Sequence, residues 1–207
     1  MEKRIHTIAD IKEAEAFLST TDKKMADLIK THGPCQISGL NQDLFTKLIN
    51  SIVSQQLSVK AAETIFSRVL ALLECTELNP AKLAATDPEQ LRSCGLSQAK
   101  TRYSLGLAKA AATGELDLKT LVEQPDDVII ETLVSYPGIG VWTAEMFLIF
   151  AIGAPDVLST ADLGLKRGIM RYLELEDYPA DEDFIQYAER WRPYRSIASW
   201  YLWRLAE

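Results

Sequence analysis

The chain has 207 residues, 47% of them apolar and 25% charged, which is an ordinary composition for a soluble protein of one large or two small domains. It contains no run of about eighteen apolar residues, so we expect no membrane span. The charged start MEKRIHTIAD lacks the apolar segment of a secretory signal, so we expect a cytoplasmic setting, or a nuclear one in a eukaryote, and no secretion. The net charge of −7 argues against a basic DNA-coating protein, but not against a DNA enzyme whose positive charge is local.

The cysteines and histidines offer little material for metal or redox chemistry. Cys35, Cys75 and Cys94 are odd in number, far apart and in no CxxC arrangement, which disfavours a disulfide framework and a zinc site. Three thiolates in one chain cannot hold a four-thiolate iron–sulfur cluster. His6 and His32 are the only histidines, so histidine-based catalysis or metal binding has little material, and we expect ordinary surface or packing roles for both. We also expect no required cofactor.

Apolar residues recur at helical spacing along the chain. Residues 44–53 and 59–73 have this pattern, and the polar segment 54–58 separates them. Asp87 and Pro88 are typical of a helix start, Gly95 of a helix end, and Ser97 of the next start. Further helices are expected at 126–135, 141–152, from 181 and at 196–205. No alternating strand pair with a hairpin turn is found, so the predicted fold class is all-α.

The segment 133–144 carries the strongest local pattern. Pro137 fixes the entry to a turn, and Gly138 and Gly140 permit backbone angles closed to other residues. The following helix begins near Gly140, where unpaired N–H groups can bind a phosphate without any basic side chain. We therefore take Gly138, Gly140, Val141 and Thr143 as candidate contacts to a DNA backbone. A plain turn between two helices is the alternative.

Several motifs in order extend this pattern into a resemblance. Residues 136–144, 156–167 and 187–196, together with Ser54-Gln55-Gln56-Leu57-Ser58, resemble the helix-hairpin-helix superfamily of DNA glycosylases, in its 3-methyladenine DNA glycosylase II branch. The resemblance covers roughly residues 40 to 205. It implies two helical lobes with a cleft between them, one at 45–150 and the other formed by 1–44 plus 155–207.

The resemblance implies that Asp162 is the catalytic carboxylate. A carboxylate beside the sugar would stabilise the cation-like transition state of N-glycosidic cleavage, and could orient the attacking water. The alternative is that Asp162 only caps a helix beginning near Leu163, and the two roles are compatible. Bifunctional members carry a Schiff-base lysine at the position of Trp142. Because tryptophan cannot act as that nucleophile, we expect base release without strand cleavage.

The resemblance also implies residues that would handle DNA. Gln56, or else Gln55, would fill the gap left by a flipped base, unless both are merely solvated helix-end residues. Trp142, and less strongly Trp200, Tyr201 and Trp203, would form an aromatic pocket for a cationic alkylated base, with packing in the core as the alternative. Main-chain carbonyls of Val134, Tyr136 and Ile139 would hold a structural Na⁺ or K⁺. Additional phosphate contacts could come from basic side chains that are otherwise solvated, namely Lys100, Arg102, Lys166 and Arg167.

These expectations together predict a monomeric, monofunctional glycosylase that excises 3-methyladenine and 7-methylguanine from double-stranded DNA during base excision repair. One alternative is an enzyme of the same fold acting on etheno-adducts or hypoxanthine. Another is a non-catalytic helix-hairpin-helix DNA-binding protein, which the presence of Asp162 disfavours. A purely structural helical bundle is disfavoured by the ordered motifs.

Overall fold

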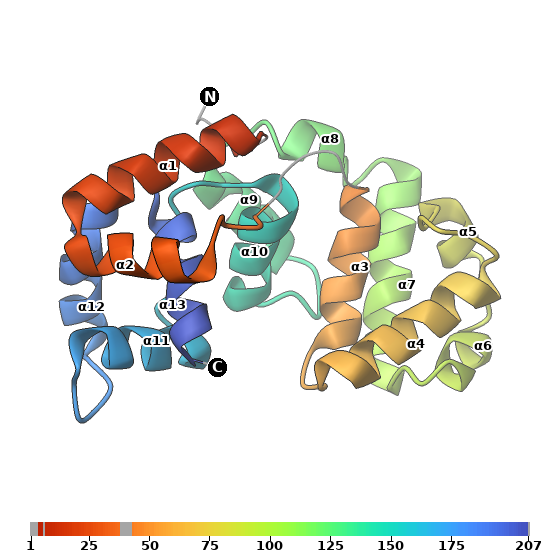
Figure 1. The fold of residues 1–207 in the computed structure, drawn as a ribbon. Helices are drawn as coiled ribbons and strands as arrows, with labels where there is room; N and C mark the ends of the chain where they lie inside the picture. The colour runs from red at the N-terminus through yellow and green to blue at the C-terminus, as the bar shows by residue number, and fades with distance from the viewer. Residues whose placement is uncertain (1–3, 6, 38–42, 207) are drawn as a thin grey trace. The chain divides into compact units, whose positions relative to one another are not determined.

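The computed structural model describes residues 4–5, 7–37 and 43–206, and all regular elements in these ranges are helical (Figure 1). The all-α prediction is therefore confirmed. None of the described helices has the length and apolarity that crossing a membrane requires.

The described residues form two compact units, one of 43–147 and one of 4–5 and 7–37 with 148–206. The expected lobes, 45–150 and 1–44 plus 155–207, have closely similar bounds. Residues 1–3, 6, 38–42 and 207 of the second expected lobe lie outside the described residues. The cleft between the lobes stays a prediction.

The first unit contains eight α-helices of the described chain. They are α3 (Leu44–Ser54), α4 (Val59–Leu72), α5 (Pro80–Ala84), α6 (Pro88–Ser93), α7 (Gln98–Thr113), α8 (Leu118–Leu121), α9 (Asp126–Val134) and α10 (Val141–Phe147). Asp43 begins α3 by accepting a hydrogen bond from the Phe45 N–H, and Ser58 begins α4 in the same way from Ala61. The buried residues of α3 recur at helical spacing, as the sequence predicts: Phe45, Leu48, Ile49, Ile52 and Val53.

The predicted boundaries of α6 and α7 are also confirmed. Asp87 accepts from the Glu89 N–H, with Pro88 at the first helical position. Gly95 has a φ of +111°, and Ser97 accepts from the N–H of Lys100. The predicted helix 141–152 is α-helical only to Phe147 and π-helical from Leu148 to Ile152. Apolar periodicity does not distinguish these two hydrogen-bond patterns.

The second unit is built from both ends of the described chain. Its elements are α1 (Ile8–Thr21), α2 (Lys23–His32), the π-helical turn η1 (Leu148–Ile152), α11 (Leu163–Leu173), α12 (Asp181–Ala188), the 3₁₀ turn η2 (Glu189–Trp191) and α13 (Arg195–Ala206). Figure 1 shows α1 and α2 as consecutive red-orange helices and α11 to α13 in blue. Thr7 and Asp10 close a capping box at the start of α1.

A close contact between α11 and α13 organises the second unit. A Cβ atom at Gly168 of α11 would lie 2.3 Å from the Leu202 carbonyl oxygen of α13, so only glycine fits there. Trp191 and Tyr201 are fully buried nearby in this unit, and the Trp191 indole donates to the buried Asp22 carboxylate at 3.1 Å. Because the indole N–H and the carboxylate are bonded to each other, neither polar group is buried without a hydrogen-bond partner.

Candidate active site

Asp162 lies at the N-terminus of α11. This is the position expected if Asp162 caps a helix, which is the alternative to a catalytic role. Its Oδ1 accepts a hydrogen bond from the Leu165 N–H at 2.6 Å, so the capping role is confirmed. The same oxygen accepts from the Trp203 indole Nε1 at 2.9 Å. Two donors from α11 and α13 therefore fix the direction of a half-buried carboxylate.

The surroundings of Asp162 leave room for this arrangement. The Trp203 ring packs on Phe150, with 5.6 Å between ring centroids and 33° between planes. A Cβ atom at Gly164 would lie 3.1 Å from Asp162 Oδ1 and 3.3 Å from Trp203 Cδ1. The glycine two residues after the carboxylate thus permits the close approach of indole and acid.

The segment leading to Asp162 is held at its other end by ion pairs. Arg195 Nε lies 2.7 Å from Asp156 Oδ1, and Arg192 lies 2.7 Å from Oδ2 of the same carboxylate. The Ser196 hydroxyl accepts from the Val157 N–H at 2.9 Å in a buried position. Charge-assisted bonds to a planar guanidinium are directional, so they anchor this segment to the start of α13.

The hairpin between α9 and α10 contains the predicted tight turn. Gly138 has a φ of +93°, a backbone conformation that L side chains rarely adopt, and a Cβ atom there would lie 2.3 Å from the Tyr103 ring. The N–H of Ile139 donates to the Tyr136 carbonyl at 3.2 Å. Gly140 has open space around it. The half-buried Tyr103 ring lies against this turn.

The loop between α3 and α4 places its two glutamines differently. Gln55 is half-buried, and its Nε2 donates to the Gly138 carbonyl at 2.8 Å and to Thr143 Oγ1 at 3.3 Å. Gln56 is exposed and has a φ of +56°. Of the two candidates for the wedge, Gln56 is therefore the exposed one. The wedge role itself stays a prediction.

The predicted aromatic residues lie in three different environments. Trp142 is 43% exposed near the start of α10. Trp200 is 6% exposed, with the Arg204 guanidinium over its ring, which favours packing over a ligand-facing position. The Tyr201 hydroxyl is hydrogen-bonded to Glu15 and to the Gly33 carbonyl inside the second unit. The Trp203 indole donates a hydrogen bond to Asp162.

Three of the four basic side chains proposed as phosphate contacts have protein partners: Lys166, Lys100 and Arg102, whose guanidinium lies 5.4 Å from the centroid of the Tyr103 ring. Lys166 lies 2.7 Å from an Asp181 carboxylate oxygen, so a phosphate would compete with that carboxylate. Lys100 donates to the carbonyls of Val53 and Gln55, and burial lowers the pKa of its ammonium. Arg102 and Arg167 are exposed. Phosphate binding by these side chains stays a prediction.

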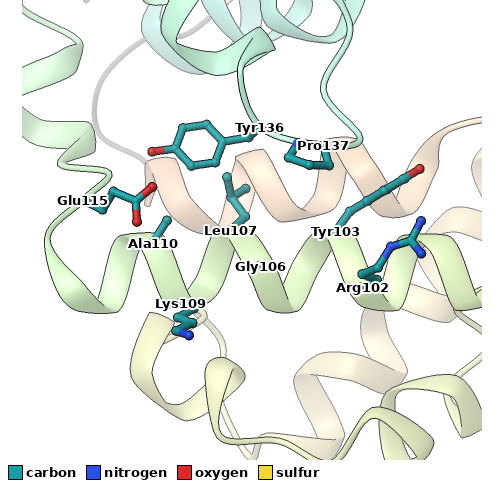
Figure 2. Close-up of a pocket in the computed structure, with 9 residues that line it drawn as sticks. All are labelled: Arg102, Tyr103, Gly106, Leu107, Lys109, Ala110, Glu115, Tyr136 and Pro137. Atoms are coloured by element: carbon teal, nitrogen blue, oxygen red, sulfur yellow. The ribbon is translucent and has the colours of Figure 1, made fainter.

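A pocket of about 360 Å³ lies beside the hairpin in the first unit. Figure 2 shows Tyr136 and Pro137 of the turn above residues of α7, with the Tyr136 hydroxyl on the side of Glu115. Burial, and next the Glu115 charge, raises the pKa of Tyr136. The pocket includes none of the predicted aromatic base-pocket residues, so the sequence reasoning did not anticipate it.

The described residues show no cluster of three or more histidine, cysteine or acidic side chains suited to a metal ion. The three cysteines are free thiols. The monovalent cation expected at Val134, Tyr136 and Ile139 would need main-chain carbonyls only, and one of these, at Tyr136, accepts from the Ile139 N–H within the turn.

Sequence reasoning missed the contacts that join distant segments. The Trp203–Asp162 and Gln55–Gly138 hydrogen bonds span 41 and 83 residues. Local patterns carry no information at such separations. The residue types alone indicate such contacts only weakly: an indole has one hydrogen-bond donor that needs an acceptor when it is buried, but the sequence does not show which acceptor it meets.

Comparisons with known proteins agree with the fold and the hairpin. The HhH-GPD superfamily of base excision DNA repair proteins matches residues 49–193. The alkylbase DNA glycosidase-like protein mag2 of Schizosaccharomyces pombe is 30% identical over 203 residues, which are 95% of this chain and 94% of that protein.

Solved structures give the same result. A DNA-3-methyladenine glycosidase from Bacillus halodurans is 34% identical, with a TM-score of 0.81 over 94% of this chain and 88% of that one. The S. pombe 3-methyladenine DNA glycosylase Mag1, in complex with abasic DNA, is 30% identical, with a TM-score of 0.80 over 93% of this chain and 95% of that one.

Proposed function

Since the chain belongs to the HhH-GPD superfamily of base excision DNA repair proteins, we propose that it is a monofunctional DNA glycosylase that excises alkylated purines. Relatives named for 3-methyladenine and alkylbase glycosylase activity support this substrate class. The observation that carries the proposal is the Asp162 carboxylate, which Trp203 and the Leu165 N–H hold in one orientation.

Asp162 would act on the bond between the base and C1′ of the sugar. As that bond breaks, its electron pair leaves with the base and positive charge develops on the sugar. A fixed carboxylate stabilises this charge without having to reorganise. Water then adds its oxygen to C1′ and gives up a proton, which Asp162 can accept. A base that carries a positive charge, such as 3-methyladenine or 7-methylguanine, leaves as a neutral molecule.

Trp142 would contribute to selection of the base and to the outcome of the reaction. Its exposed indole offers an electron-rich face to a cationic base. Because it stands where bifunctional relatives place a lysine, the chain has no amine there to form a Schiff base. The proposed product is therefore an abasic site in an unbroken strand.

The first unit would bind the DNA backbone through the hairpin. Main-chain N–H groups near Gly138, Gly140, Val141 and Thr143 can contact a phosphate, which suits a chain with a net charge of −7. We propose that a monovalent cation, held by the carbonyls of Val134, Tyr136 and Ile139, bridges the hairpin to that phosphate, because uncharged oxygen donors suit Na⁺ and K⁺. We also propose that the protein acts on duplex DNA as a monomer.

The test is release of free base from methylated duplex DNA, with strands examined for nicks before and after alkali. We expect free 3-methyladenine and nicks that appear only after alkali. Asp162→Asn keeps the helix cap but removes the charge, so base release should be abolished while binding to abasic DNA persists. Asp87→Asn, at another N-cap, is the matched control and should remain active.

Other outcomes would correct the proposal in specific ways. Full activity of Asp162→Asn would refute the catalytic carboxylate. Release of etheno-adducts or hypoxanthine instead of methylated purines would change the substrate class. Binding to DNA without release of methylated purines, etheno-adducts or hypoxanthine would favour a non-catalytic DNA-binding protein.

A further inference from the structure

Two polar side chains tie the loop Gln55–Ser58, here called the wedge loop, to other parts of the first unit. One tie comes from Lys100 on α7, and the other comes from Gln55 within the loop itself. All of these residues belong to the same compact unit.

The first tie secures the end of α3. The Lys100 ammonium donates to the Val53 carbonyl at 2.8 Å and to the Gln55 carbonyl at 2.6 Å. The last carbonyls of a helix have no partners within the helix, and a cation is the favourable partner for them. Burial lowers the pKa of Lys100, which agrees with an ammonium that is partly withdrawn from water.

The second tie joins the wedge loop to the hairpin turn and to the helix that follows it, α10. Gln55 Nε2 reaches the Gly138 carbonyl in the turn and the Thr143 hydroxyl in the first part of α10. Thr143 is 4% exposed, so this contact is shielded from water. Hydrogen bonds with such shielding resist competition from solvent.

Gln56 lies directly after these ties and has a φ of +56°. Residues other than glycine adopt this backbone region rarely, and they keep it only when neighbouring structure restrains it. The carbonyl and the side chain of Gln55 are both fixed, so the ties restrain the residue immediately before Gln56.

We propose that Gln55 and Lys100 are positioning residues for Gln56: Gln55 couples the wedge loop to the hairpin, and Lys100 holds the Gln55 carbonyl and the end of α3 in place. Phosphate binding at the hairpin then brings Gln56 into the duplex, because the two segments are bonded within the same compact unit. This inference rests on the proposed function, in which the hairpin binds the DNA backbone and Gln56 fills the gap left by the flipped base.

The experiment follows wedge insertion independently of base release. A duplex carries a tetrahydrofuran abasic analogue with 2-aminopurine beside it, and stopped-flow fluorescence reports the change in stacking when a side chain enters. Gln55→Met and Lys100→Met should slow this change about tenfold, since each removes hydrogen bonds to shielded carbonyls. Affinity for undamaged duplex should stay within about twofold, because the hairpin N–H groups remain.

Two controls separate positioning from general structural damage. Lys100→Arg keeps a cation with several donors and should restore most of the insertion rate. Lys109→Met, which alters an exposed lysine of the same helix, should have no effect. If Lys109→Met slows insertion as much as Lys100→Met, the specific role of Lys100 is wrong.

A double-variant cycle gives the decisive readout. Gln55 acts through Gln56, so in a Gln56→Ala background the change Gln55→Met should cost less than about twofold. If Gln55→Met slows the fluorescence change by the same factor in the wild-type and the Gln56→Ala backgrounds, the inference is wrong. Wild-type protein that changes the fluorescence but releases no base would leave the coupling intact and refute only the glycosylase activity. Wild-type protein that leaves the fluorescence unchanged would overturn the coupling itself.

Discussion

The indole Nε1 of Trp203 donates a hydrogen bond to Oδ1 of Asp162 at 2.9 Å. This bond joins α13 to the first residue before α11, and the Trp203 ring is itself held against Phe150. A carboxylate that already points in a fixed direction has no orientational freedom to lose when charge develops beside it. If Asp162 is the catalytic carboxylate, we expect Trp203 to act as its positioning residue, whether or not it also lies near the base.

Trp203→Phe should separate orientation of Asp162 from ring packing. Phenylalanine retains an aromatic ring against Phe150 but lacks the donor. Losing one hydrogen bond to a charged group corresponds to about 1.5–3 kcal/mol, so single-turnover base release should fall roughly tenfold to a hundredfold. Affinity for abasic DNA should change little. If Phe150→Leu reduces release by the same factor as Trp203→Phe, the contribution is packing and not the hydrogen bond.

Substitution by alanine should affect stability differently at the two hairpin glycines, Gly138 and Gly140. Gly138→Ala places a Cβ atom 2.3 Å from the Tyr103 ring at a positive φ, so the free energy of unfolding should fall by about 2 kcal/mol or more, and DNA binding should weaken. A Cβ at Gly140 meets open space, so Gly140→Ala should keep stability within about 0.5 kcal/mol. Thermal unfolding and duplex binding together check both outcomes. Equal destabilisation by the two changes would contradict this distinction.

Much of the helical framework could be predicted from local chemistry. Asp87 and Ser97 signal helix starts because their side chains accept from unpaired N–H donors within three residues, and Pro88 suits the first helical position because it has no N–H to satisfy; the structure has them in these roles. The capping of α11 by Asp162 is predictable for the same reason. Such interactions depend only on neighbours in the chain.

Interactions between distant segments could not be predicted in this way. Nothing near Lys100 in the sequence indicates that its ammonium meets the carbonyls of Gln55 and Val53, 45 and 47 residues away. Trp200 and Trp203 lie on one helix and have the same residue type, yet the first is buried and the second contacts the carboxylate. Which side of α13 faces Asp162 depends on how α11 packs against it, and these helices approach closely where Gly168 meets the Leu202 carbonyl.

Gly168→Ala should therefore be among the most damaging changes in the second unit. The added Cβ would lie 2.3 Å from the Leu202 carbonyl oxygen, which is backbone and cannot rotate away. We expect unfolding free energy to fall by about 3 kcal/mol, as for overpacked cores. Gly106→Ala on α7 is the matched control: its Cβ meets nothing within 4 Å, so stability should rise by about 0.5–1 kcal/mol. Urea denaturation of both variants measures the difference, and a mild effect at Gly168 would show that α13 can shift.

Cys35 should make the protein less stable at alkaline pH. Burial, the largest cause, raises the pKa of its thiol from 9.0 to about 12. Below pH 9 both the folded and the unfolded chain carry the proton, and the stabilising contribution is fully present. Between pH 9 and about 12 the unfolded chain releases the proton while the folded chain retains it, so unfolding becomes more favourable as pH rises. The loss approaches roughly 4 kcal/mol at the upper end of this window.

Cys35→Ala removes this titration and should flatten the dependence of unfolding free energy on pH between 9 and 11. The tyrosines whose pKa burial raises, Tyr172 and Tyr201, contribute a slope of the same sign, so some dependence should persist in the variant. Alkylation at pH 8.5 offers an independent check on the folded protein. Cys75 is partly exposed and should react first, whereas Cys35 should react only at the rate of unfolding. Fast alkylation of Cys35 in folded protein, or an unchanged slope in Cys35→Ala, would show that this thiol is more accessible than its 6% exposure indicates.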